Sequence, residues 1–178
     1  MITDQALSGL KVVEFGDLIS APFCAKLMAD LGAEVIKIEE PPLGDSSRQV
    51  GPFPGNSPHP ERSGLFLYLN TNKYGITLNS RVETGIHILK ELVKSADILV
   101  ENRSPAAMEK LGLDYEALNK LNPGLIMTSI TPFGQVGLYS HYKGDDLICC
   151  HMSGIAYHTP AGGVENLEEE PPLKPGGR

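Results

Sequence analysis

Two polar segments hold most of the side chains that could bind an anionic ligand. Asn70-Thr71-Asn72-Lys73 follows one expected strand, and Asn102-Arg103-Ser104-Pro105 follows another. Because open parallel sheets bind ligands at the carboxyl ends of their strands, these segments are the first candidates for a site. Their amides and cations suit phosphates, or an amide-rich chain such as pantetheine. The alternative for each segment is a polar turn that binds nothing.

Three isolated cations, Arg48, Lys110 and Lys143, could add positive charge to such a site. The loop Gly16-Asp17-Leu18-Ile19-Ser20-Ala21-Pro22 precedes an expected helix, whose N-terminus offers N–H groups to an anion or a carbonyl oxygen. This loop lacks the G-x-G-x-x-G fingerprint of dinucleotide sites. A nicotinamide or flavin site therefore has little support, although Glu39 stands where a ribose-binding acid would. A plain strand–helix turn is the alternative.

The side chains form no recognisable catalytic or metal-binding arrangement. Asp145 and Asp146 are adjacent, so in a helix they point about 100° apart and cannot face one another; a helix N-cap is the better interpretation. Cys24 lies among apolar helix residues and is expected in the core. The histidines have no metal-ligand spacing, and Cys149-Cys150 lacks the spacing of a zinc site. We therefore expect a binding surface with no catalytic residue and no metal.

Alternating strands and helices are expected to position these segments. β-Branched runs predict the strands Lys11–Phe15, Glu34–Ile38, Leu65–Asn70, Tyr74–Asn79, Ile98–Glu101 and Leu125–Ile130. Caps and apolar periodicity predict helices beginning at Ser20, Ser80, Asp114 and Asp145. In the first helix Phe23, Leu27 and Leu31 recur at helical spacing, and Ser80 with Glu83 should form the capping box of the second. This alternation indicates an α/β fold, Rossmann-like and doubly wound, with a mostly parallel sheet.

Composition limits the class of protein. The chain of 178 residues, 41% of them hydrophobic, suits one domain, placed at 1–157 with a Pro/Gly-rich loop at 41–63 and a linker or tail at 158–178. A net charge of -7 argues against a nucleic-acid partner. The apolar runs are too short to span a membrane and no signal segment is seen, so the cytoplasm is the expected compartment.

Several motifs together resemble the family III CoA-transferases. The segments are LSGLKVVEFGDLISAPFCAKLMADLGAEVIKIEEP, LNTNKYGITLN, ADILVENRSPAAMEKLGLDYEALNKLNPGLIMTSITPFGQVG, GDDLICCHMSG and PPLKPGG. The resemblance extends over nearly the whole chain. It implies an N-terminal Rossmann-like domain that binds coenzyme A, with acyl-CoA and a carboxylic acid as substrates and no prosthetic group. It also implies an interlocked homodimer of the parent protein.

The resemblance assigns the coenzyme A contacts by position. The matching residues are Ile19, Ser20, Leu69, Asn70, Asn72, Lys73, Asn102, Arg103, Lys110, Leu111 and Lys143. One position departs from the pattern, because Glu40 stands where formyl-CoA transferase has a CoA-contacting arginine. Arg48 is the expected substitute.

The resemblance also implies an aspartate nucleophile, which forms an acyl anhydride and then a CoA thioester. That aspartate follows a Pro-Pro-Leu segment in the family. Here Pro171-Pro172-Leu173 is present and the chain stops at Arg178. We therefore expect an N-terminal part of the enzyme, incomplete without a second domain and inactive by itself.

Two alternatives stay open. The parent could be an acyl-CoA racemase or isomerase of the same family, although Asp145 stands where the racemase branch has its catalytic histidine. The chain could also be a stand-alone CoA-binding or regulatory module.

Overall fold

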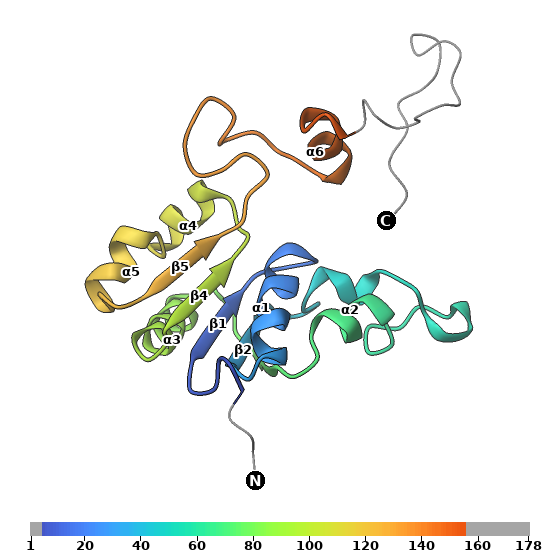
Figure 1. The fold of residues 1–178 in the computed structure, drawn as a ribbon, viewed down its shortest axis with the longest axis horizontal. Helices are drawn as coiled ribbons and strands as arrows, with labels where there is room; N and C mark the ends of the chain where they lie inside the picture. The colour runs from blue at the N-terminus through green and yellow to red at the C-terminus, as the bar shows by residue number, and fades with distance from the viewer. Residues whose placement is uncertain (1–4, 156–178) are drawn as a thin grey trace. The chain divides into compact units, whose positions relative to one another are not determined.

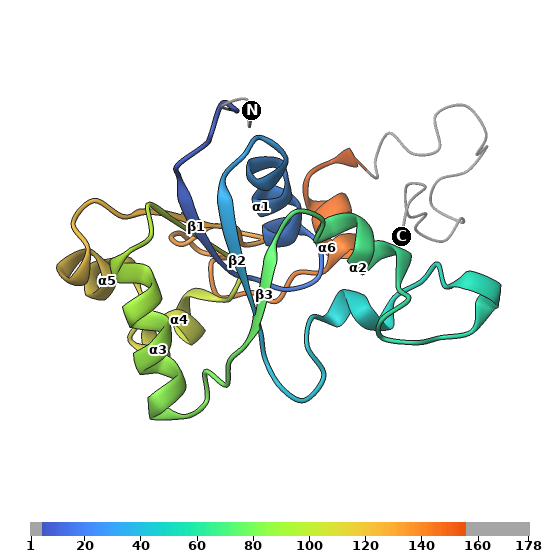
Figure 2. The ribbon, with the colours of Figure 1, turned by 90° about the horizontal axis from the view of Figure 1, so that it is seen from below.

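The computed structural model describes residues 5–155. They belong to two compact units, divided between Thr131 and Pro132. The first contains a five-stranded, all-parallel sheet in the order β3-β2-β1-β4-β5 (Figures 1 and 2). Its strands are β1 (Lys11–Phe15), β2 (Glu34–Glu39), β3 (Tyr74–Thr77), β4 (Ile98–Glu101) and β5 (Ile126–Ser129). The predicted parallel α/β sheet is confirmed.

The strand order places the change of winding direction at β1. This central strand pairs with β2 on one side, Lys11 opposite Glu34, and with β4 on the other, Val12 opposite Ile98. In doubly wound sheets the carboxyl ends of the strands at such a switch point form the ligand-binding crevice. The loops after β1, β2 and β4 are therefore the region to inspect.

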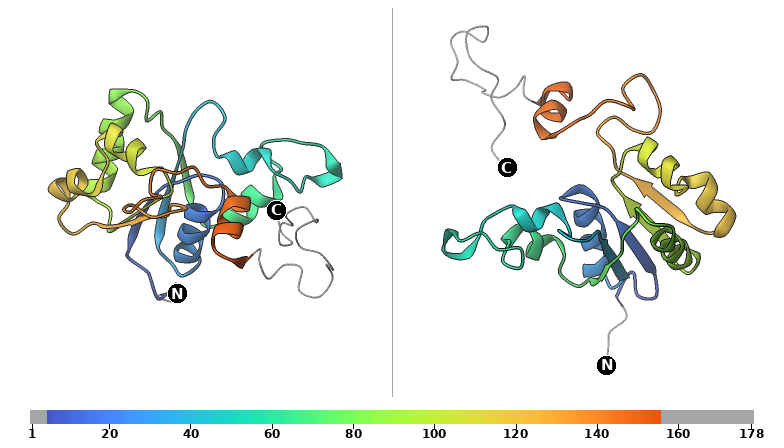
Figure 3. Two further views of the ribbon diagram at one scale, coloured as in Figure 1. Left: turned by 90° about the horizontal axis from the view of Figure 1, so that it is seen from above. Right: turned by 180° about the vertical axis from the view of Figure 1, so that it is seen from behind.

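Helices cover both faces of the sheet (Figure 3). Helix α1 (Ser20–Asp30) packs on one face through a cluster that includes Val12, Val35 and Val100. Helices α3 (Glu83–Lys94) and α5 (Tyr115–Leu121) pack on the other through a second cluster. The remaining helices are α2 (Gly64–Leu69), α4 (Pro105–Leu111) and α6 (Asp146–Met152), the last in the second unit.

The large apolar residues whose spacing predicted helix α1 do not form its buried face. Phe23, Leu27 and Leu31 are between 40% and 50% exposed, whereas Ala21 and Ala25 are fully buried. Small side chains let the helix backbone approach the sheet closely, so the alanine side faces the core and the larger residues face outward. Periodicity alone could not choose between these two sides of the helix.

Two further local predictions differ from the structure. Leu65–Asn70 is not a strand but most of α2, which begins after Ser63, whose hydroxyl accepts the N–H of Phe66 at 3.1 Å. The capping box of α3 does not form: Val82 is the N-cap residue without a side-chain hydrogen bond, and the Ser80 hydroxyl donates to Glu40 instead. Of the two adjacent aspartates predicted to supply an N-cap, Asp145 does so, because its carboxylate accepts the N–H of Ile148 at 3.0 Å.

The loop at 41–63 is irregular apart from two 3-10 turns, Ser46–Gln49 and Pro54–Asn56. In the described part of the chain, no helix is long and apolar enough to cross a membrane. Residues 5–155 also contain no group of three or more histidine, cysteine or acidic side chains placed to hold a metal ion. The tail predicted at 158–178 lies outside the described residues.

Candidate functional site

Asn102 joins the carboxyl ends of β4 and β1. Its side-chain oxygen accepts the N–H of Asp17 at 2.8 Å, and its Nδ2 donates to the Asp17 carbonyl at 2.7 Å and to Ser20 Oγ at 2.9 Å. The amide thus pairs with both backbone groups of one residue. A Cβ on Gly16 would lie 2.3 Å from that of Ala21, so this close approach requires glycine. The structure brings together two predicted site residues, Ser20 and Asn102.

The loop between β1 and α1 is also fixed from the other side. Asp17 accepts the Ser46 N–H at 2.7 Å and the Ser46 hydroxyl at 2.6 Å. The N–H of Leu18, which has a left-handed φ of 64°, points to Asp45 Oδ1 at 3.3 Å. Ile19, a predicted contact, follows directly and is exposed. The backbone next to the first turn of α1 is therefore held in one conformation by the loop after β2.

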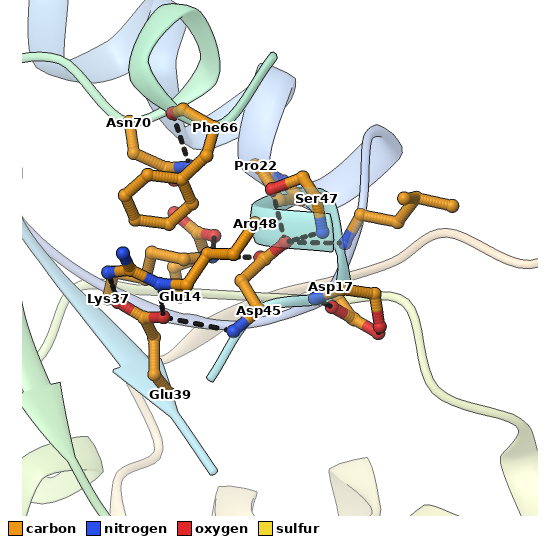
Figure 4. A network of polar contacts seen from close by, with 12 residues as sticks. Glu14, Asp17, Pro22, Lys37, Glu39, Asp45, Ser47, Arg48, Phe66 and Asn70 are labelled. Carbon is orange, nitrogen blue, oxygen red and sulfur yellow. Dashed lines mark hydrogen bonds and ion pairs between the residues drawn. The ribbon is translucent and has the colours of Figure 1, made fainter. Parts of the chain in front are cut away.

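A buried network of charges lies beneath this loop (Figure 4). Lys37 of β2 donates to Glu14 Oε1 of β1 and to Asp45 Oδ2, both at 2.6 Å. These three side chains are at most 2% exposed. Burial alone would lower the pKa of Lys37, but the charges of Glu14 and Asp45 outweigh it and raise that pKa above its usual value. The charged Lys37 side chain therefore links the sheet to the loop after β2.

Lys73 completes the network, and its ammonium group is fully hydrogen-bonded. Its Nζ lies 2.7 Å from Glu14 Oε2, 2.8 Å from the Pro22 carbonyl and 3.0 Å from Asn70 Oδ1. An ammonium has three N–H donors, and three acceptors surround this one. Burial lowers the pKa of Lys73 despite the opposing charge of Glu14. The predicted cation thus binds protein groups, with its side chain only 1% exposed.

The rest of the predicted Asn70–Lys73 segment lies at the amino end of β3, because the preceding element is helix α2. The expected position at a strand's carboxyl end is wrong for this segment. Asn72 donates to Asp30 at 2.8 Å, and Leu69 is buried. Asn72 and Lys73 line a hollow of about 560 Å³ at the amino edge of the sheet, together with Gly9, Lys11, Gly32, Ala33, Glu34 and Tyr74.

A second hollow, of about 530 Å³, lies at the carboxyl edge and is called here the carboxyl-edge cavity. Its lining residues come from the ends of β1 and β2, the loop at 41–49, and the segments after β3 and β4: Gly16, Asp17, Ile38, Glu39, Glu40, Pro41, Pro42, Leu43, Gly44, Asp45, Ser46, Gln49, Arg81 and Arg103. This is the switch-point position expected for a ligand. Its two cationic lining residues are Arg81 and Arg103.

Arg103, a predicted site residue, is held against the wall of this cavity. Its guanidinium carbon lies 4.1 Å from the centre of the Phe15 ring, and Nη2 lies 3.7 Å from Glu40 Oε2. Its Nε is buried and has no hydrogen-bond partner among residues 5–155. The backbone N–H of Arg103 donates to Glu101 at 2.6 Å, and burial raises the pKa of that carboxyl.

Arg48, the expected substitute for a missing arginine, is engaged elsewhere. Its Nε and Nη2 donate to the two oxygens of Glu39 at 2.7 and 2.9 Å, and Nη1 lies 3.0 Å from Glu61. The guanidinium also stacks over Phe66 at 3.6 Å. Burial would raise the pKa of Glu39, but these hydrogen bonds and the N–H of Asp45 lower it. The pair anchors the loop at 41–63 to the end of β2.

Three other predicted residues are not among those that line this cavity. Lys110 is exposed in the last turn of α4, and Leu111 packs partly buried against the core under α3 and α5. Lys143 is exposed and belongs to the second unit.

Sequence reasoning missed the charged residues that support the site, Glu14, Lys37 and Asp45. A signal was present for two of them. Glu14 and Lys37 interrupt the short apolar runs KVVEF and EVIKI, and a charge inside a buried parallel strand needs a partner. The position of Asp45 depends on the fold of a long loop, which no local pattern specifies.

Comparison with known proteins gives a family match. The sequence pattern of the CoA-transferase family III matches residues 7–177. The chain is 38% identical to succinyl-CoA:glutarate CoA-transferase of Mus musculus over 97% of its length, and 39% identical to acetyl-CoA:oxalate CoA-transferase of Acetobacter aceti over 95%. It spans 37% and 41% of these relatives, respectively.

Solved structures of two other proteins are similar to this chain in fold. A CAIB/BAIF family protein from Brucella suis superposes with a TM-score of 0.81 at 35% identity, covering 97% of this chain and 44% of that protein. Rv3272 from M. tuberculosis superposes with a TM-score of 0.79 at 31% identity, covering 96% of this chain and 46% of that one.

Proposed function

Since the chain belongs to the CoA-transferase family III, we propose that it forms the coenzyme-A-binding part of an enzyme that moves CoA between carboxylic acids. The observation that carries this proposal is the carboxyl-edge cavity, together with the family match. The cavity lies at the switch point of a doubly wound sheet and is lined by Arg81 and Arg103. Two arginines in one such cavity suit a ligand that carries phosphates, although the chain as a whole is acidic.

The loop between β1 and α1 supplies the second part of the proposed site. Asn102 and Asp45 fix this loop, so Ile19 and Ser20 are presented in one conformation. The first turn of α1 adds N–H groups that favour an anion or a carbonyl oxygen. We propose that phosphates bind near the arginines and that the pantetheine arm runs along this loop.

The proposed reaction uses an aspartate that the resemblance places outside the described residues. Its carboxylate attacks the thioester carbonyl of the donor, forming an anhydride and releasing the CoA thiolate. The thiolate then attacks the aspartyl carbonyl and expels the donor acid. The acceptor carboxylate takes the same two steps in reverse, leaving the aspartate free. Because the resemblance places the nucleophile outside the described residues, we propose that residues 5–155 bind CoA without catalysing its transfer.

The racemase alternative gains no support from the site. Asp145 is an exposed N-cap of α6, engaged with the N–H of Ile148. In this structure Asp145 therefore has the structural role of a helix cap.

Calorimetric titration of CoA into the 178-residue chain tests the proposal. We expect saturable binding that Arg103→Ala weakens about tenfold. Lys120→Ala removes an exposed cation from the last turn of α5 and should leave the affinity unchanged. An assay with succinyl-CoA and glutarate should show no transfer. Absence of CoA binding would refute the proposed site, and turnover by the pure chain would show that a nucleophile lies within it.

A further inference from the structure

Each of the four carboxylates that line the carboxyl-edge cavity has a partner in the protein. Glu39 is bound by Arg48, and Asp45 by Lys37. Asp17 accepts both the N–H and the hydroxyl of Ser46. Glu40 alone among these carboxylates faces a cation that lines the same cavity, since its Oε2 is 3.7 Å from Arg103 Nη2.

The contact between Glu40 and Arg103 is weak for an ion pair. At 3.7 Å the two atoms are too far apart for a hydrogen bond, which needs about 3.2 Å or less. The carboxylate is held by its other oxygen, which accepts the Ser80 hydroxyl. Arg103 in turn is fixed against Phe15 and has a buried Nε without a partner in the described part of the chain. A phosphate could offer this guanidinium shorter, charge-assisted bonds of about 2.7–2.9 Å.

Arg81 supplies a second cation to the same cavity. It follows Ser80 directly, and its backbone N–H donates to Asn79 at 3.0 Å. Its guanidinium forms no ion pair with any residue in the range 5–155, and the residue is exposed. Arg81 is therefore available to an incoming anion without breaking an existing contact.

We propose that Arg81 and Arg103 form a phosphate-binding site in this cavity, and that Glu40 is a built-in competitor that limits its affinity. The inference rests on the proposed function, because the phosphate is one of those carried by CoA. In the free protein the Glu40 carboxylate partly neutralises Arg103. When CoA binds, its phosphate forms hydrogen bonds with the Arg103 guanidinium, while the hydroxyl of Ser80 keeps Glu40 in place. The charge of Glu40 thus opposes the phosphate and lowers the affinity of the site for it.

Titrations of CoA and dephospho-CoA, which differ by one phosphate, test the inference on the full chain. Glu40→Gln keeps the shape of the side chain and removes its charge, so we expect CoA to bind about 5- to 20-fold more tightly. Arg81→Ala should weaken binding. Glu116→Gln, in the first turn of α5, is the matched control for loss of one acidic charge and should have little effect.

Comparison of CoA with dephospho-CoA shows which phosphate occupies the site. A gain for CoA alone places the ribose 3′-phosphate between the arginines, and a gain for both ligands places the diphosphate there. Unchanged affinity of Glu40→Gln for both, while the wild-type chain binds CoA, would overturn the inference and leave the proposed function standing. If Glu40→Gln does not fold, Glu40→Ala serves in its place, and Arg81→Ala tests the second cation independently. No binding of CoA by the wild-type chain would refute the proposed function itself.

Discussion

The ammonium nitrogen of Lys73 lies 2.7 Å from Glu14 Oε2, although the two residues are 59 positions apart. Glu14 also receives Lys37 through its other oxygen, at 2.6 Å. One buried carboxylate on β1 therefore joins β2 to the turn before β3. The contact explains why Lys73, a predicted CoA contact, is buried here: it joins β1 to the segment before β3.

Replacing Lys73 should destabilise the fold. Lys73→Met keeps most of the stem but leaves Glu14 with one partner, and breaking a buried ion pair typically costs about 3–5 kcal/mol. Urea denaturation at neutral pH measures this. Lys94→Met is the control, because Lys94 forms a surface pair with Glu91 and should have a much smaller effect. An unfolding free energy of Lys73→Met equal to that of the control would contradict the buried network.

The Lys73–Glu14 pair also means that a binding defect in a Lys73 variant has two possible causes. Loss of CoA affinity in a Lys73 variant would follow from a displaced β3 as readily as from a lost contact. Only a variant whose stability is unchanged can report a direct role, which is why the exposed Arg81 is the sharper probe of the site.

Glu39 should make the stability depend on acid pH. Its folded pKa is lowered relative to the ordinary value of 4.5, so its contribution is fully present above that value and is lost as pH falls through the folded pKa. We expect wild type to be more stable than Glu39→Gln at pH 7, with the difference shrinking below about pH 4.5. Denaturant titrations of both proteins from pH 7 to pH 3 measure this difference. A gap that stays constant over that range would show that the Arg48–Glu39 pair does not stabilise the charged form.

Helix α1 should tolerate changes on its large outer side chains and resist changes on its small inner ones. Ala25 is fully buried against the sheet, so Ala25→Leu forces extra volume into a packed layer and should cost about 1–3 kcal/mol or more. Leu27 is 50% exposed, and Leu27→Ala should change the unfolding free energy by much less. Thermal unfolding of the two variants checks the ranking. The reverse order would contradict the packing of α1 through its alanine side.

The sheet was predictable because its strands carry strong local patterns. Lys11–Phe15, Glu34–Glu39 and Ile98–Glu101 lie where β-branched runs predicted strands, and their parallel pairing follows from the alternation with helices. The short apolar run at Leu65–Leu69 fits a helix or a strand equally well by pattern. The Ser63 hydroxyl, which caps α2 and lies 2.7 Å from the Ser47 carbonyl oxygen and 2.6 Å from that of Val50, favours the helix.

The site was predictable only in part, because only some of its residues follow strands with a strong local pattern. Asn102 follows a well-predicted strand, so its place at the carboxyl edge and its contact with Ser20 follow from the topology. Asn70 to Lys73 were placed through the mistaken strand, and so the prediction put them at the wrong edge. Ser80 was assigned to its own helix, whereas it bonds Glu40, 40 residues away. Long-range polar contacts of this kind leave no local pattern.

The central claim is that CoA binds at the carboxyl edge of this sheet, and amide chemical shifts of the ¹⁵N-labelled chain during a CoA titration test it most directly. We predict saturable shifts at Asp17, Leu18 and Arg103, around the carboxyl-edge cavity. Gly32 and Ala33, which line the hollow at the opposite edge, should stay unshifted. Shifts confined to Gly32 and Ala33, or no shifts at any CoA concentration, would contradict the account.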